Sequence, residues 1–220
     1  MWTYFRNPLI ELGIPTETAR KPLRPHVHTN VQVMVVTKGS RRVNLARQAV
    51  NVLTNSILII PPGVVHLADQ DDWEGFNAYI DPSVRYNWIA SILRYPSLPD
   101  WVCDMSKNGP SFDLPALLSL ISEGRLVWAD PKLSKYRYDH HEMPDWPQSR
   151  EGHIRRYKRE AGISPHAHFK ATQLDQARSK IANGETLASV AAELGFTDQS
   201  HLGRQFRASF GISPGRYAKG

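Results

Sequence analysis

A run of hydrogen-bonding side chains follows a glycine near the C-terminal end of the chain, in the stretch GFTDQSHLGRQF at 195–206. Gly195 suits the left-handed conformation that ends one helix, and Thr197 is able to cap the next. The first turns of that next helix expose four polar or charged side chains: Gln199, Ser200, Arg204 and Arg207. Such groups near a helix N-terminus are the first to meet base edges when the helix lies in a DNA groove.

Three predicted helices position these side chains. The first covers 165–183 and begins with the cap Ser164, and the second covers 187–194 and begins with the cap Thr186. The third covers 197–211 and places its apolar residues on one face. Two helices joined by a tight, glycine-containing turn form a helix-turn-helix, whose second member can lie in a major groove.

An internal repeat supports this prediction. RRYKREAGISP at 155–165 aligns without gaps with RQFRASFGISP at 204–214. Five positions are identical: Arg155/Arg204, Gly162/Gly211, Ile163/Ile212, Ser164/Ser213 and Pro165/Pro214. The repeat predicts two copies of one module, joined by the helix over 165–183, that present two recognition helices to successive grooves.

The charge of the chain is unevenly distributed. Residues 1–149 carry 15 Lys and Arg against 15 Asp and Glu, whereas residues 150–220 carry 12 against 6. The whole excess of +6 therefore lies in the last third, which favours a polyanionic partner for that third. The alternative is a basic surface that serves solubility alone.

The last third resembles the DNA-binding domain of AraC/XylS-type bacterial transcription regulators, through SREGHIRRYKREAGISPHAHF, LASVAAELGF and TDQSHLGRQFRASFGISPGRY within 149–217. The resemblance implies double-stranded DNA as the partner, with RNA polymerase as a further one, and recognition helices at about 149–161 and 198–210. It implies base-reading roles in the second helix for Gln199, Ser200 and Arg204, and in the first helix for Arg150, Glu151 and Arg155. It implies phosphate contacts for Thr197, His201 and Arg207.

The first of the two units departs from the family pattern. A capped amphipathic helix is expected before Ser149, and the segment DHHEMPDWPQ at 139–148 does not supply one. His153 also stands where the repeat has the apolar Leu202. A deletion, a compact unit completed by residues 132–143 and a non-functional first unit all remain open.

The first two thirds of the chain have a different pattern. Residues 31–80 contain short runs rich in Val, Ile and aromatic residues, which predict an antiparallel sheet or small barrel. Apolar residues at helical spacing predict helices in 84–95 and 114–124. The chain is thus predicted to be an α+β protein in three parts: an antiparallel β-barrel domain with helices at 1–125, a linker with a short helix at 126–148, and an all-α helix-turn-helix domain at 149–220.

Three features of the barrel domain, HVH at 26–28, Gly39 and PPGVVH at 61–66, resemble the motifs of cupin-like β-barrels, so the domain at 1–125 is expected to be cupin-like. Sensory domains of this type are often joined to such a DNA-binding domain. In cupin enzymes, two histidines, a glutamate and a third histidine hold a metal. Three histidines match that set here, and a glutamine stands roughly at the position of the acid: His26, His28, His66 and Gln32.

These residues could form a binding site, because two imidazoles two residues apart on a strand point the same way. With no carboxylate to complete a typical metal set, we predict no metal and no cofactor. The predicted site is instead a small-molecule effector pocket lined by His26, His28, Gln32, His66 and Tyr79, with surface or structural histidines as the alternative.

We therefore predict a cytoplasmic, non-enzymatic transcription regulator whose barrel senses a small molecule or joins two chains into a homodimer. A metal-dependent cupin enzyme with a helical tail and a DNA-binding protein whose barrel only dimerises are the alternatives. Cys103 is the single cysteine, which excludes an intrachain disulfide. The N-terminus lacks the pattern of a signal peptide, and no apolar run approaches the ~20 residues that span a bilayer.

Overall fold

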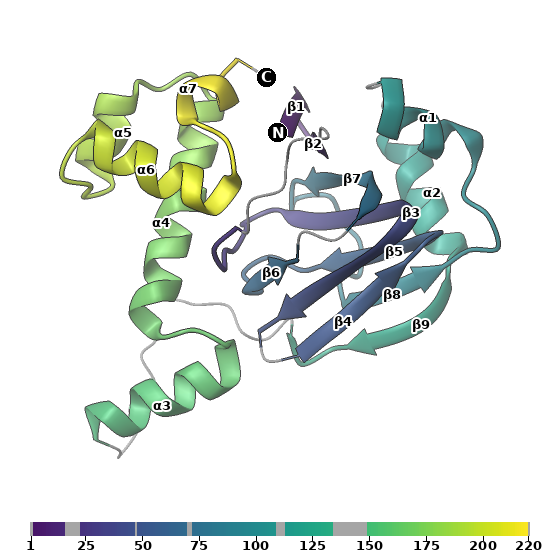
Figure 1. The fold of residues 1–220 in the computed structure, drawn as a ribbon, viewed down its shortest axis with the longest axis horizontal. Coiled ribbons are helices and arrows are strands. Elements are labelled where there is room, and N and C mark those ends of the chain that lie inside the picture. Colours follow the sequence, from purple (N-terminus) through teal and green to yellow (C-terminus); the bar gives the residue numbers. More distant parts are fainter. Residues whose placement is uncertain are drawn as a thin grey trace.

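The computed structural model describes residues 2–15, 23–46, 48–69, 72–108, 113–133 and 149–219. Nine strands of the described chain form one sheet, in which every pairing is antiparallel. They are β1 (Trp2–Asn7), β2 (Ile10–Pro15), β3 (Val31–Leu45), β4 (Gln48–Leu53), β5 (Ser56–Ile60), β6 (His66–Ala68), β7 (Trp73–Ile80), β8 (Ala90–Arg94) and β9 (Arg125–Asp130). The predicted antiparallel β-domain is confirmed, and the helical part of the chain lies beside it (Figure 1).

The long strand β3 organises the sheet. Its first half, Val31–Val36, pairs with β7 on one side and β5 on the other, and its second half pairs with β4 and β6. The register shifts between Val36 and Lys38, and Gly39 follows with a φ of 75°. Such an irregularity bends a strand, so that the two halves of β3 belong to different parts of a curved sheet.

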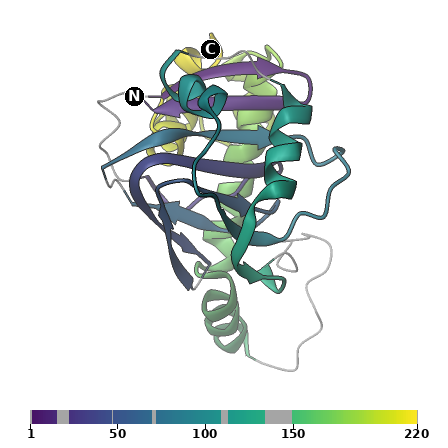
Figure 2. The same cartoon turned by 90° about the vertical axis from the view of Figure 1, so that its right-hand side faces the viewer.

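Both faces of β3 are buried. Val33 and Val35 belong to a core that α1 (Asp100–Asn108) and α2 (Leu114–Glu123) complete from outside the sheet. Met34 and Val36 point the other way and belong to a second core inside the curved sheet. Figure 2 shows the two helices lying across the sheet.

Two predictions for the middle of the chain were wrong. Residues 84–95 were predicted to be helical, but they contain strand β8, which pairs with β5. Four consecutive residues of β8, from Ala90 to Leu93, are buried, and a short apolar run buried on both faces resembles a helix in sequence. Residues 126–130 were assigned to the linker, but they lie in β9, which pairs with β8. The rest of the predicted linker beyond residue 133 lies outside the described residues.

The helical part contains α3 (Arg150–Ala161), α4 (Pro165–Ala182), α5 (Leu187–Glu193), α6 (Gln199–Phe210) and α7 (Pro214–Tyr217). The predicted caps Ser164 and Thr186 each accept a hydrogen bond from the backbone N–H three residues on. The prediction that Thr197 caps α6 was wrong. Asp198 is the cap, and its carboxylate accepts from the N–H of His201 at 2.7 Å.

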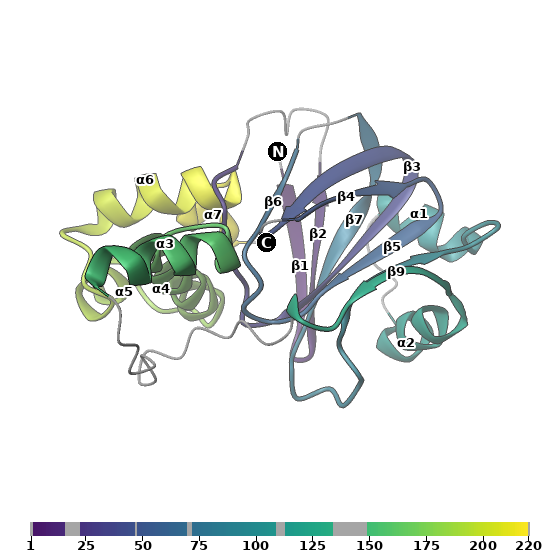
Figure 3. The same cartoon turned by 90° about the horizontal axis from the view of Figure 1, so that it is seen from below.

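The helical part packs directly against the sheet domain. Trp2 and Tyr4 of β1 share one buried cluster with Leu202, Phe206 and Phe210 of α6. The ring of Tyr4 also meets the ring of Tyr217 edge to face, with centroids 5.0 Å apart. Figure 3 shows the helical part on one side of the curved sheet and α2 on the other.

Candidate nucleic-acid interface and buried histidine cluster

Helix α6 has two distinct sides. Leu202 and Phe206 are fully buried, whereas the polar residues predicted to contact DNA face away from the core. Five of the six are exposed, namely Thr197, Gln199, Ser200, Arg204 and Arg207. The sixth, His201, is half-buried with its ring 5.7 Å from that of Phe196. The structure thus presents the predicted side chains on α6 and on the residue before its cap, Thr197.

Helix α3 is the structural counterpart of α6. Both helices have 12 residues, and their caps, Ser149 and Asp198, occupy equivalent positions of the repeat. Both helices end at a left-handed glycine, Gly162 with a φ of 82° and Gly211 with a φ of 71°. The predicted first-unit residues Arg150, Glu151 and Arg155 are all exposed. The sequence repeat is therefore a repeat of structure.

The two helices differ in how they are anchored. Helix α6 has four buried residues, whereas α3 has only Ala161. The hydroxyl of Tyr157 lies 2.6 Å from Nδ1 of His168 on α4, which ties α3 to that helix. His153 is half-buried, at the position where α6 has the fully buried Leu202. The helix missing from the first unit would fall in 134–148, outside the described residues.

Helix α4 separates α3 from α6. It has 18 residues, a length of about 27 Å at 1.5 Å per residue. Figure 1 shows α3 at one end of α4 and α6 near the other. Successive major grooves on one side of a duplex are about 34 Å apart. The two exposed helices are thus carried on a spacer of comparable length.

The basic residues of this part fall into two groups. Arg178 and Lys180 on α4 are occupied by ion pairs with carboxylates. Arg155 and Arg207 make no ion pair among the residues that the structure describes. Exposed guanidinium groups in this state can meet phosphates without first breaking a bond within the protein.

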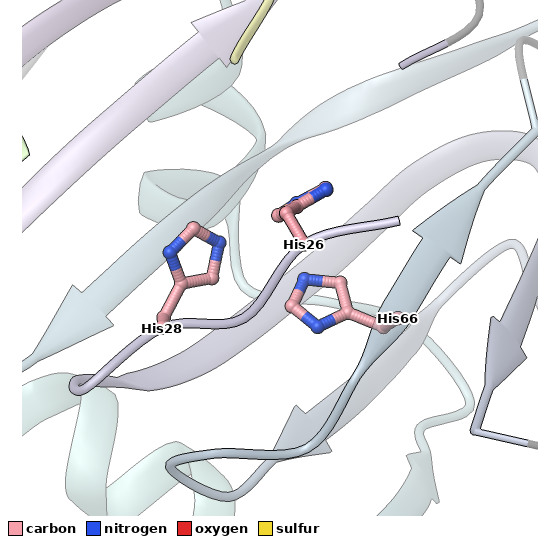
Figure 4. A group of neighbouring side chains, drawn as sticks. All are labelled: His26, His28 and His66. Carbon is pink, nitrogen blue, oxygen red and sulfur yellow. The ribbon is translucent and has the colours of Figure 1, made fainter. Parts of the chain in front are cut away.

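Three predicted pocket residues form a compact cluster on the inner side of the sheet domain. His26, His28 and His66 are each at most 7% exposed. One ring nitrogen of each lies within 4.8 Å of those of the other two. Figure 4 shows His26 and His28 on one segment and His66 at the start of β6, with the three rings grouped together. An isolated bridge between His26 and His66 holds the two segments side by side.

The hydrogen bonds of the cluster fix which nitrogen carries the proton. Nδ1 of His26 lies 2.8 Å from the carbonyl oxygen of Arg24, and Nδ1 of His66 lies 2.9 Å from that of Val64. A carbonyl oxygen only accepts, so each Nδ1 donates and each Nε2 of the neutral ring presents a lone pair. Burial, with the neighbouring His28, lowers the pKa of His26 to about 3, and burial lowers the pKa of His66 well below its usual value.

His28 reaches across to the helical part. Its Nδ1 lies 3.2 Å from a carboxylate oxygen of Asp175 on α4. Burial alone would raise the pKa of Asp175, but the Arg178 guanidinium and the hydrogen bond from His28 hold that pKa well below its usual range. The carboxylate therefore accepts, and Nδ1 of His28 donates. Burial lowers the pKa of His28 as well, so this ring is also neutral with its lone pair on Nε2.

The cluster borders a very small cavity. Four of the predicted pocket residues meet there, as His26, Gln32 and His66 line it together with Tyr79. Its volume is about 20 Å³, which suits one water-sized occupant, whereas organic ligands need at least about 300 Å³. The predicted residues thus come together, but the cavity between them excludes an organic effector in this conformation.

A buried ionic network joins the two parts of the molecule beside this cluster. Arg178 on α4 donates to Glu11 of β2 at 2.6 Å and to Asp175 at 3.0 Å. Glu11 also accepts from the hydroxyl of Tyr217. These residues were not predicted from the sequence. The sequence does contain one signal for such a network. The oppositely charged Asp175 and Arg178 lie next to apolar positions of the amphipathic helix predicted over 165–183.

Comparisons with known proteins agree with both parts of the structure. Residues 149–220 match the family described as a helix-turn-helix domain, and residues 13–114 match the AraC-like ligand-binding domain. The fold therefore joins a curved β-domain to a helix-turn-helix domain. The chain combines an AraC-like ligand-binding domain with a helix-turn-helix domain.

Curated relatives match about a third of the chain. The HTH-type transcriptional regulator MtrA of Neisseria gonorrhoeae is 32% identical over 72 residues, which are 32% of this chain and 24% of that protein. The probable transcriptional regulator LumQ of Photobacterium leiognathi is 39% identical over 62 residues, 28% of this chain and 25% of that protein. The chain thus spans about a quarter of the length of these relatives.

Solved structures match the whole fold. An apo variant of ToxT from Vibrio cholerae superposes with a TM-score of 0.53 at 10% identity, covering 97% of this chain and 98% of that one. Wild-type ToxT bound to an unsaturated fatty acid gives a TM-score of 0.50 at 10% identity, covering 90% and 89%. Among the described residues, every helix is too short or too polar to cross a bilayer.

Proposed function

We propose that this protein is a sequence-specific DNA-binding transcription regulator that presents α3 and α6 to one face of a duplex. The observation that carries the proposal is the structural equivalence of these helices, which share length, cap position and C-terminal glycine at the two ends of α4. A duplex repeats its major groove about every 34 Å, so two like helices on one spacer suit two successive grooves.

We assign roles by position on these helices. Gln199, Ser200 and Arg204 lie on the first turns of α6, where side chains reach base edges, and Arg150, Glu151 and Arg155 are their counterparts on α3. Thr197, His201 and Arg207 are assigned to phosphates, which fix the register of the helix on the duplex. No catalytic role is assigned to the chain.

The regulator is further proposed to respond to a small organic effector. The match of residues 13–114 to the AraC-like ligand-binding domain supports this response. An open crevice of about 530 Å³ lies where the two parts of the molecule meet, lined by Arg6, Glu11, Asn30, Arg178 and Tyr217 among others. A molecule bound there contacts both parts, so its binding can favour one placement of the helices over another.

Self-association through the barrel is a further proposal. Strand β9 is the last strand on its side of the described sheet, and Leu126 and Val127 on it are 59% and 43% exposed. Two tethered chains would bind DNA more tightly than one. Sedimentation of the full chain should show a dimer at micromolar concentration, and a monomer alone would contradict it. RNA polymerase as a partner stays a prediction.

DNA binding itself is tested by titrating a fluorescent duplex with the full chain at two salt concentrations. Contacts to phosphates release counterions, so the affinity should fall steeply from 50 to 200 mM salt, by roughly 10³-fold or more for about six contacts. The full chain is required, because α6 packs on β1. Equal affinity at both salt concentrations, or no binding, would contradict the proposal.

A further inference from the structure

The three buried histidines each bind an oxygen through one ring nitrogen, and two of them hold the other nitrogen without a hydrogen-bond partner among the described residues. Each Nδ1 donates to an oxygen: Arg24 O for His26, the Asp175 carboxylate for His28 and Val64 O for His66. The Nε2 atoms of His28 and His66 are buried without a hydrogen-bond partner. A buried acceptor without a hydrogen bond is energetically costly. In metal sites, the nitrogen of a histidine that does not bind the metal usually donates to an oxygen that orients the ring, and each Nδ1 here makes such a bond.

We propose that His26, His28 and His66 bind one divalent transition metal ion, of the class of Zn²⁺, Co²⁺ or Ni²⁺, through their Nε2 atoms. Neutral imidazole is a ligand that suits these ions. The Nδ1 atom of each ring already has an oxygen partner, so Nε2 is the atom left to bind an ion. This site belongs to the protein itself and does not depend on the proposed function.

The geometry is close to that of a three-histidine site. Two nitrogens bound 2.0–2.1 Å from a tetrahedral ion lie about 3.4 Å apart, and the ring nitrogens here lie within 4.8 Å. The ring centroids are 4.4 to 5.2 Å apart. Small ring rotations therefore close the set around an ion.

The neighbouring cavity suits an ion better than an organic ligand. Its volume of about 20 Å³ is that of a single water-sized occupant. Gln32 and Asn77 also line it, and their side-chain oxygens, Oε1 and Oδ1, are buried without a hydrogen-bond partner. The lining thus offers several acceptors to an occupant, and either amide oxygen or a water can supply a fourth ligand. A closed site of this size has no room for a substrate, which indicates a structural or regulatory ion.

Two charged residues act on the ion in opposite directions. Arg41 lines the same cavity, and its positive charge opposes a cation. Asp175 supports a cation, because a carboxylate that accepts from Nδ1 raises the basicity of Nε2 of His28. Asp175 lies on α4 and also bonds Arg178 and the backbone of Thr29. Metal occupancy is therefore linked to the helix that carries α3 and α6.

The test is titration of the chelator-treated full chain with Co²⁺, followed through the visible bands of the bound ion, with Zn²⁺ added to displace it. One equivalent should bind. His26→Ala, His28→Ala and His66→Ala should each abolish the bands, while His166→Ala, which alters an exposed histidine on α4, should leave them unchanged. No bands with the wild-type chain, or equal bands in all four variants, would overturn the proposal.

Measurements on the wild-type chain and on variants at other positions test the proposal even if a histidine variant does not fold. With ¹⁵N-histidine labelling, Zn²⁺ should shift three Nε2 resonances of the wild-type chain, and a shift of fewer than two would overturn it. Asp175→Asn should weaken Zn²⁺ binding by about 10- to 100-fold. Arg41→Met should tighten it, since an opposing charge is removed. Weaker Zn²⁺ binding in Arg41→Met would contradict the placement of the ion beside Arg41.

Discussion

Asp175 and His28 lie 147 positions apart in the sequence, and a hydrogen bond of 3.2 Å joins them across the boundary between the barrel and the helical part. Both side chains are almost completely buried. The same carboxylate accepts from the backbone and hydroxyl of Thr29 and from Arg178. Helix α4 is thus fixed to the barrel beside the histidine cluster, and this carboxylate links the cluster to the helical part.

Glu11→Gln should destabilise the folded chain by about 3 kcal/mol, because Arg178 then remains buried with one carboxylate partner instead of two. Unfolding in urea measures the change. Glu74→Gln is the matched control, since it breaks the exposed pair with Lys38, and it should have no measurable effect. Equal losses in the two variants would show that the buried network does not hold the two parts together.

Gly162→Ala should destabilise the chain more than Gly184→Ala. Both glycines have a φ above 80°, which costs an alanine about 1–2 kcal/mol, and nothing lies within 4 Å of a Cβ at Gly184. At Gly162 a Cβ would lie 2.2 Å from the carbonyl oxygen of Ala46, so the start of α4 must move away from the barrel. Thermal unfolding compares the two, and equal losses would contradict the close approach.

Arg204→Ala should cost about 1–3 kcal/mol on the specific DNA site and relax the preference at one base pair, because a guanidinium can grip O6 and N7 of guanine together. Arg207→Ala should weaken binding to all sequences alike and reduce the salt dependence, because it removes a phosphate contact. Titrations of specific and scrambled duplexes separate the two effects. An equal loss of affinity for the specific and the scrambled duplex in Arg204→Ala would contradict a base-reading role for this residue.

Arg155→Ala tests whether the first unit reads DNA. Its position matches that of Arg204 in the repeat, so the loss of preference should fall about one helical turn, roughly 10 bp, from the base pair that Arg204 reads. The measurement is base preference at each position of the site. A variant with unchanged base preference would show that the first unit lacks a reading function.

Local signals predicted the helical part well. The Gly, Ser and Pro residues of the repeat mark where α3 and α6 end and where α4 and α7 begin, and such punctuation acts through backbone conformation within a few residues. The cap of α6 was displaced by one residue because Thr197 and Asp198 are both good caps.

Signals that depend on tertiary packing were harder to interpret. Strand β8 was predicted to be helical because it is buried on both faces, so its sequence lacks alternation. The cluster of His26, His28 and His66 was predicted from two short motifs. The partner of His28, Asp175, could not be predicted, because a contact between distant segments leaves no local pattern in the sequence.

The most direct test of the central claim is selection of bound sequences from a random duplex library by the full chain. We predict an enriched site with two blocks about 10 bp apart, one for each exposed helix. Arg204→Ala, selected in parallel, should lose the preference at one base pair of one block. No enrichment by the wild-type chain, or the same enriched site with Arg204→Ala, would contradict the assignment of α6 as a base-reading helix.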